Sequence, residues 1–274
     1  MKKSLPFALM MVALLIGANM ANAQQVPDPQ VADLVRSGKL RVALFLPQYT
    51  KDPVTGEIRG QGSGAVTVQI AQALAARLGV EVQLVGYPTP PEVVECLKAG
   101  ACDVGFLGIN PSRAAEVAFS PPVVQFDFTY LVPAGSSIRS VADADRPEVR
   151  IAVVRNHEST MALSRILKHA KLVYAETPDP TFDLLRTGHA DVMASVRRGL
   201  LEYSAKLPGS RVLEDRYGAN LLAMAVPKEQ TRRLAYFSEF IEEAKASGLV
   251  QRAIERAGQR ATRVAPPGYP TVQK

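Results

Sequence analysis

The sequence predicts an α/β protein made of two lobes with a ligand cleft between them. Strand-like and helix-like segments alternate over residues 40–107, and the same order recurs over residues 150–194. Such alternation is typical of a parallel sheet covered by helices, because a parallel crossover needs a connection long enough for a helix. A chain of 274 residues allows one large or two medium domains. Two copies of one topology, joined by extended segments, favour two lobes.

The first α/β unit starts with a strand over residues 40–46, which is rich in apolar and β-branched residues. Residues 47–64 are predicted to form a loop, because glycines and turn dipeptides recur there. The unit then continues with a helix over 65–78 that ends at Gly79, a strand over 80–85, a helix over 92–98 and a strand over 104–107. Ligands bind beyond the carboxyl ends of such strands, so the loops after Leu46 and Leu107 are candidate sites.

The second unit repeats this order after an extended apolar strand over residues 126–132. Its predicted elements are a strand over 150–154, a helix over 157–169, a strand over 172–175, a helix over 180–187 and a strand over 191–194. The chain returns through a strand over 221–226, and amphipathic helices follow over 229–257.

The first 23 residues predict a secretory signal peptide and therefore a periplasmic protein. Lys2 and Lys3 precede the apolar stretch 5–16, and Ala21-Asn22-Ala23 is a small-x-small cleavage site. The apolar stretch is too short for a stable span, although a retained membrane anchor is the alternative.

Charge and cysteine content exclude several classes of function. The formal net charge is +6 at pH 7, but the basic residues are interspersed with acids, so we expect no nucleic-acid partner. The two cysteines, Cys96 and Cys102, favour a disulfide in an oxidising compartment, with two buried free thiols as the alternative. No histidine lies near them in the sequence. We expect no metal, no cofactor and a monomer.

The most distinctive motif lies in residues 99–122. Gly100 and Asp103 precede an apolar strand, Arg113 follows it, and Phe119-Ser120-Pro121-Pro122 ends the segment. This pattern resembles the signature of the family 3 extracytoplasmic solute-binding proteins, the receptors of polar amino-acid ABC importers.

The resemblance covers about residues 33–260 and implies the type II periplasmic-binding-protein fold. In that fold, residues 24–131 and 222–264 would form lobe 1, and residues 132–221 would form lobe 2. Residues 265–274 are predicted to be a loose C-terminal tail, because prolines and glycine dominate there.

The resemblance makes Arg113 the leading ligand-binding residue, as a bidentate partner of a carboxylate. A planar guanidinium matches a carboxylate and keeps its charge in a dry cleft. The alternative is a surface arginine paired with Glu116. Gly108 and Asn110 stand where the family holds the carboxylate and ammonium of its ligands, although Asn110 could instead be a turn former before Pro111.

Further ligand contacts are implied in both lobes. Asn156 and His157 lie at a helix start that clamps the carboxylate in the family, with helix capping as the alternative for Asn156. In lobe 1, Tyr49 falls near an aromatic residue that stacks on the ligand, and Phe45 takes the place of a polar contact.

The largest departure from the family follows Asp191. The aspartate that pairs with a ligand ammonium would fall at Val196, or at Ser195 or Arg197 if the register shifts by one residue. Because no acid stands there, an ordinary α-amino acid is disfavoured as a ligand. Arg197 could contact a second acidic group or be a solvated arginine at a helix start.

These residues predict a periplasmic receptor, not an enzyme, that closes its lobes on a small carboxylate-bearing solute and delivers it to a membrane ABC permease. One alternative is a partner protein on the same scaffold, for example one serving a quinone-dependent alcohol dehydrogenase. A dehydratase-like enzyme is a further alternative. It would need an acid in the cleft, for which Glu158 is the candidate.

Overall fold

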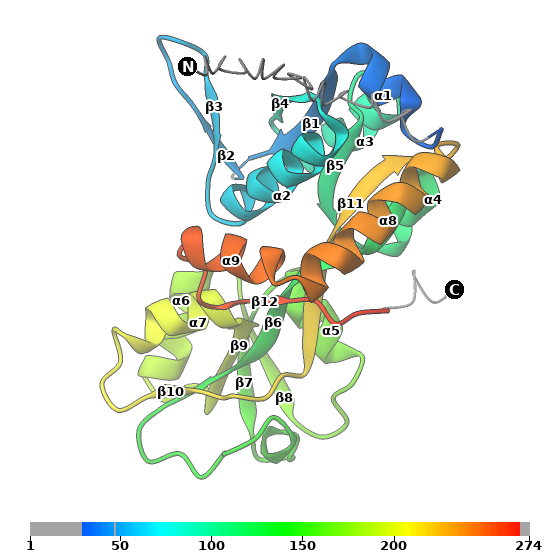
Figure 1. Ribbon diagram of the computed structural model, residues 1–274. Coiled ribbons are helices and arrows are strands. Elements are labelled where there is room, and N and C mark those ends of the chain that lie inside the picture. Colours follow the sequence, from blue (N-terminus) through cyan, green and yellow to red (C-terminus); the bar gives the residue numbers. More distant parts are fainter. Residues whose placement is uncertain (1–28, 47, 269–274) are drawn as a thin grey trace, which may run out of the picture.

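The computed structural model describes residues 29–46 and 48–268 as two α/β lobes (Figure 1). The predicted signal peptide over residues 1–23 lies outside the described residues, as do residues 269–274 of the predicted tail. In the described part of the chain, helices are too short or too polar to cross a membrane.

The first lobe contains the predicted unit of alternating strands and helices. Its elements are α1 (Ala32–Ser37), β1 (Lys39–Phe45), α2 (Ser63–Leu78), β4 (Glu81–Tyr87), α3 (Pro90–Lys98), β5 (Val104–Gly108), α4 (Pro111–Glu116), β11 (Gly218–Pro227), α8 (Thr231–Ala246) and α9 (Leu249–Arg256). Strand β1 runs parallel to β4 and β5, as expected, whereas β11 is antiparallel to β5.

The second lobe repeats the alternating order of strands and helices found in the first lobe. Its elements are the 3₁₀ turn η1 (Ala142–Ala144), β7 (Arg150–Val154), α5 (Glu158–Ser164), β8 (Lys171–Ala175), α6 (Pro178–Arg186), β9 (Val192–Val196), α7 (Arg197–Ser204) and β10 (Arg211–Val212). Strand β7 is parallel to β8 and β9. The alternating units of the two lobes therefore share one order of strands and helices.

One long strand, β6 (Val117–Val132), belongs to both lobes. The main sheet runs in the order β4-β1-β5-β11-β6-β9-β7-β8, and the short strands β10 and β12 (Thr262–Val264) also pair with β6. Along β6, Val124 packs into the core of the first lobe, whereas Tyr130 packs into that of the second. Strand β6 therefore contributes to the cores of both lobes, and the lobe boundaries at residues 131 and 222 stay a prediction.

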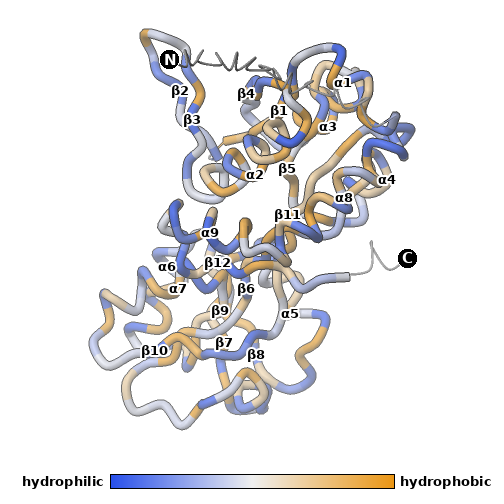
Figure 2. Tube along the Cα trace, in the orientation of Figure 1, coloured by the Kyte–Doolittle hydropathy of each residue, from blue (hydrophilic) through white to orange (hydrophobic). Residues whose placement is uncertain are grey.

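Apolar residues cover both faces of the sheet in each lobe, and Figure 2 shows them concentrated on the inner strands. Helix α2 illustrates the cause, because Val66, Ile70 and Leu74 recur every four residues and are all buried. Gly79 ends this helix in the left-handed conformation, which glycine adopts at little steric cost.

The predicted loop over residues 47–64 is only partly a loop. It contains an antiparallel hairpin of β2 (Tyr49–Lys51) and β3 (Ile58–Gly60). The hairpin returns the chain to Gly64, where an added Cβ would lie 1.7 Å from the carbonyl oxygen of Gln48. Only glycine permits so close an approach of two backbone segments.

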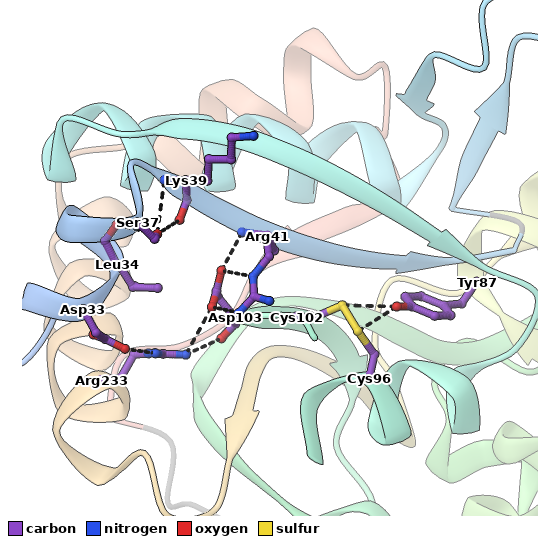
Figure 3. A network of polar contacts seen from close by, with 10 residues as sticks. All are labelled: Asp33, Leu34, Ser37, Lys39, Arg41, Tyr87, Cys96, Cys102, Asp103 and Arg233. Carbon is purple, nitrogen blue, oxygen red and sulfur yellow. Dashed lines mark hydrogen bonds and ion pairs between the residues drawn. A yellow bond between two sulfur atoms is a disulfide. The ribbon is translucent and has the colours of Figure 1, made fainter. Parts of the chain in front are cut away.

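A buried carboxylate ties the strands of the first lobe together (Figure 3). Asp103 accepts hydrogen bonds from the backbone N–H of Arg41 at 2.8 Å and from its Nη2 at 2.7 Å, and Arg233 pairs with it from α8. Asp191 repeats this geometry in the second lobe, where it accepts from the N–H of Arg150 at 2.8 Å. The aspartate of the sequence motif is therefore a structural residue.

The predicted disulfide between Cys96 and Cys102 is present, and both cysteines are buried (Figure 3). It joins the end of α3 to the start of β5, beside the hydroxyl of Tyr87, which contacts Cys96 Sγ at 2.7 Å. The predicted tail begins with Ala265, which is buried and whose N–H donates to the carbonyl of Val123. That residue is part of the packed fold.

Candidate ligand-binding cleft

A cavity of about 430 Å³ lies between the two lobes. Strand ends, loops and helix starts of both lobes form its wall. The lining residues are Phe45, Gln48, Gln61, Gly62, Ser63, Pro90, Gly108, Arg113, Phe126, Glu158, Arg198, Asn220 and Leu222. The predicted residues Phe45, Gly108 and Arg113 are among them, so the loops after β1 and β5 both contribute, as the parallel sheet predicts.

Arg113 is the half-buried cation of this cavity. Its Nη1 donates to the carbonyl of Gly108 at 2.9 Å, and the ion pairs found among the described residues do not include it. Burial lowers the pKa of Arg113, and the carboxylate of Glu158 opposes that shift. Because an arginine stays protonated at neutral pH, the rest of its planar fork is available to an anion.

Gly108 and Asn110 position Arg113. An added Cβ at Gly108 would lie 3.3 Å from Nη1 of Arg113 and 3.0 Å from the side chain of Asn220, so a larger residue would crowd both. Asn110 caps α4, since its Oδ1 accepts the backbone N–H of Arg113 at 2.8 Å. Asn110 therefore makes the local contact expected of a turn former, and it also lines an adjoining cavity.

Glu158 contributes an acid from the second lobe. It is the first residue of α5, and its Oε2 accepts a hydrogen bond of 2.6 Å from Nδ2 of Asn220 on β11. Sequence reasoning named Glu158 only as a candidate acid and missed Asn220, because the bond joins residues 62 positions apart. The cleft thus contains one carboxylate that faces the lobe of Arg113.

Arg197 and Arg198 are neighbours with different surroundings. Arg197 is buried; its Nη1 donates to the carbonyl of Leu213 at 2.7 Å, and its Nε lies 3.4 Å from Oδ2 of Asp127. Arg198 is exposed and lines the cleft, and its Nη1 would lie 3.5 Å from a Cβ added at Gly62. Arg198 was not predicted as a ligand contact.

The remaining predicted residues are not among the described lining of the cleft. His157 caps α5 by accepting the N–H of Ser159 at 3.3 Å, and burial lowers its pKa, which Glu158 partly opposes. Asn156 precedes this cap with a φ of 58°. Ser195 is half-buried on β9, and the ring of Tyr49 packs against Gly86.

The donor set of the cleft suits an organic anion better than a metal ion. Within residues 29–46 and 48–268, His, Cys, Asp and Glu side chains form no group of three or more that could hold a metal. Arg113 and Arg198 are cationic, and Gln48, Gln61 and Ser63 add polar side chains. The arrangement can bind a small anionic group and surround it from two lobes.

A family comparison matches most of the chain. The model of the bacterial extracellular solute-binding proteins, family 3, matches residues 54–259. That range includes the whole second lobe, the first lobe from β3 to α9, and every lining residue of the cleft except Phe45 and Gln48.

Solved structures of similar fold include binding proteins and an enzyme. An ancestral cationic amino acid solute-binding protein aligns with a TM-score of 0.60 at 25% identity, over 82% of this chain and 98% of that chain. An ancestral cyclohexadienyl dehydratase aligns with a TM-score of 0.59 at 26% identity, over 84% and 96% of the two chains.

A curated relative is the virulence sensor protein BvgS of Bordetella bronchiseptica. It is 29% identical over 136 residues, which are 49% of this chain and 11% of the sensor protein. The chain therefore spans about a tenth of the length of the curated relatives that it matches.

Proposed function

Because the chain belongs to the bacterial extracellular solute-binding proteins of family 3, we propose that it captures a small carboxylate-bearing solute between its lobes. The observation that carries this proposal is the half-buried guanidinium of Arg113, which lines an interlobe cavity and is absent from the ion pairs of the described chain. A buried cation without a counterion is costly, and a ligand carboxylate would supply that counterion. Residues from two lobes would then hold the ligand, so that binding favours closure.

Calorimetric titration of the protein with amino acids, dicarboxylates and aromatic acids tests this proposal. A carboxylate that binds should lose affinity about 30-fold or more in Arg113→Met, because the variant removes a charge-assisted fork. Arg36→Met is the matched control, since Arg36 is exposed on α1 and not among the described lining residues. Equal affinity of the two variants would exclude Arg113 as the anchor.

Delivery to an ABC permease and a periplasmic location complete the proposed role. Support comes from the family, whose members are extracellular solute-binding proteins. The similarity to a sensor protein favours a second destination, a receptor protein that responds to the ligand-bound lobes. Uptake of the radiolabelled ligand by cells with and without this gene separates the two, because a sensory role would leave uptake unchanged.

An enzymatic role has a specific observation in its favour. Glu158 lies in the same cavity as Arg113, and one solved structure of similar fold, at 26% identity, is that of an ancestral cyclohexadienyl dehydratase. We propose binding without conversion, because Glu158 is the acid of the described lining and that lining includes neither a histidine nor a cysteine. A ligand recovered unchanged after prolonged incubation, with its mass checked by spectrometry, would support binding alone.

A further inference from the structure

A second cavity, of about 380 Å³, adjoins the cleft of Arg113. It lies between the start of α4 in one lobe and α5 in the other, with β11 alongside. Its lining residues are Ile109, Asn110, Pro111, Ser112, Phe128, Glu158, Met161, Ala162, Arg165, Ala219 and Asn220. Glu158 and Asn220 line both cavities, so the two spaces meet at this pair.

The two cavities differ in chemistry. The first contains two arginines, Arg113 and Arg198, whereas the second contains one, Arg165, and is lined mainly by apolar residues. Ile109, Phe128 and Met161 are its large apolar side chains. Met161 is 47% exposed, so its side chain keeps apolar surface that a ligand could cover. Contact with an apolar group would remove this surface from water, which is favourable in proportion to the area buried.

A single hydrogen bond lies where the cavities meet. Asn220 Nδ2 donates to Glu158 Oε2 at 2.6 Å, and Glu158 is exposed. Both side chains are flexible, so rotation about their own bonds would open a passage without movement of the backbone. One ligand could then occupy both spaces.

We propose that the second cavity binds an aromatic or branched aliphatic group of a ligand whose carboxylate lies at Arg113. This inference rests on the proposed function and names the class of solute. The anionic end pairs with the guanidinium, and the apolar end lies against Ile109, Phe128 and Met161. Because the wall comes from both lobes, closure brings more apolar surface against the ligand.

A pair of acids that differ only in the apolar group tests the proposal. Calorimetry would compare propionate with 3-phenylpropionate, and the phenyl acid should bind about tenfold or more tightly. Ser112→Trp places an indole in the second cavity from an exposed position and should reduce that ratio to about threefold or less. Ala115→Trp is the matched control on the same helix, outside the described lining, and should keep the ratio.

The NMR signal of the Met161 methyl group locates the phenyl group in the unsubstituted protein. In protein labelled with ¹³C-methyl methionine, and with the signal assigned through Met161→Leu, the Met161 resonance should shift with 3-phenylpropionate and not with propionate. Equal affinity of the two acids would overturn the proposal while leaving the carboxylate anchor intact. A phenyl preference that survives Ser112→Trp and leaves Met161 unshifted would also overturn it. If neither acid binds while another carboxylate binds at Arg113, this proposal is overturned and the proposed function stands.

Discussion

Arg113 and Arg197 are arginines near the cleft whose surroundings give them different roles. Arg197 donates to the carbonyls of Leu213, Glu214 and Asp215, so the fold itself supplies acceptors to both of its terminal nitrogens. Arg113 donates to one carbonyl, that of Gly108, and lies in the cavity. The number of fixed backbone acceptors around each guanidinium therefore distinguishes a structural arginine from one available to a ligand.

We expect His157 to make the stability of the fold depend on pH. Burial lowers its pKa from the ordinary 6.5, with opposition from Glu158. At pH values between the pKa of His157 in the folded protein and its ordinary value, the unfolded chain binds more protons than the folded protein. The free energy of unfolding therefore rises with pH in this range, and this stability is lost as the pH falls. Protonation also removes the acceptor at Nδ1, which caps α5. We expect the free energy of unfolding to fall as the pH drops below about 6.5.

Urea denaturation at a series of pH values measures this dependence. His157→Asn keeps a capping acceptor but does not titrate, so its stability should change less over the same range. Parallel pH profiles of the two proteins would contradict the assignment to His157.

A residue of the candidate site could be predicted where the sequence around it forms a motif. Arg113 follows a buried strand within a recognisable motif, so its position was clear from the sequence. Arg197 was predicted as a contact, but Arg198 lines the cleft, because adjacent residues at a helix start differ in direction. Asp127, which lies 70 positions before Arg197 in the sequence, decides which side chain is buried. Such a non-local contact leaves no periodic pattern in the sequence.

At the scale of elements, the disulfide holds the connection between α3 and β5. Cys96 and Cys102 close a short loop immediately before Asp103, whose carboxylate binds Arg41. A crosslink of this length stabilises the folded state by about 2 kcal/mol in the chain-entropy model. The bridge and the carboxylate together fix the start of β5, whose other end leads to Gly108 in the cleft.

Replacing both cysteines by serine should therefore lower the free energy of unfolding by about 2 kcal/mol, because the unfolded chain regains the freedom that the crosslink removed. Urea denaturation of the oxidised protein and of Cys96→Ser/Cys102→Ser gives the difference, with the reduced protein as a control. Ligand affinity should stay within about threefold, since neither cysteine lines the described cleft. A large loss of affinity would show that the bridge also shapes the site.

Most of the strands and helices could be predicted, and the errors have physical causes. The helix expected over 157–169 ends at Ser164, because the N–H groups of residues 168–170 donate to the carboxylate of Asp145. Strand β6 begins nine residues before the predicted start at 126. Pro121 and Pro122 suggested a turn, but the pairing of β6 with β11 is irregular there and tolerates them.

At the scale of the whole molecule, Asp127 connects segments that meet where the lobes join. It lies on β6, is 1% exposed, and pairs with three arginines from different parts of the chain. Arg197 comes from α7, Arg216 precedes β11, and Arg263 lies on β12. Since β6 contributes to the cores of both lobes and pairs with β11, one carboxylate on β6 holds three arginines where the lobes join.

Asp127→Asn should destabilise the whole protein, because it leaves three arginines around a neutral amide. Arg197 is only 7% exposed, and a buried charge without its partner costs about 3–5 kcal/mol. Urea denaturation followed by circular dichroism measures the loss, and Glu57→Gln is the control, since Glu57 pairs with Arg59 on the exposed hairpin and should matter far less. Because β6 contributes core residues to both lobes, the variant should lower the stability of both together, which tryptophan reporters placed separately in each lobe would detect. A loss confined to one lobe would mean that Asp127 stabilises that lobe alone and does not tie the two together.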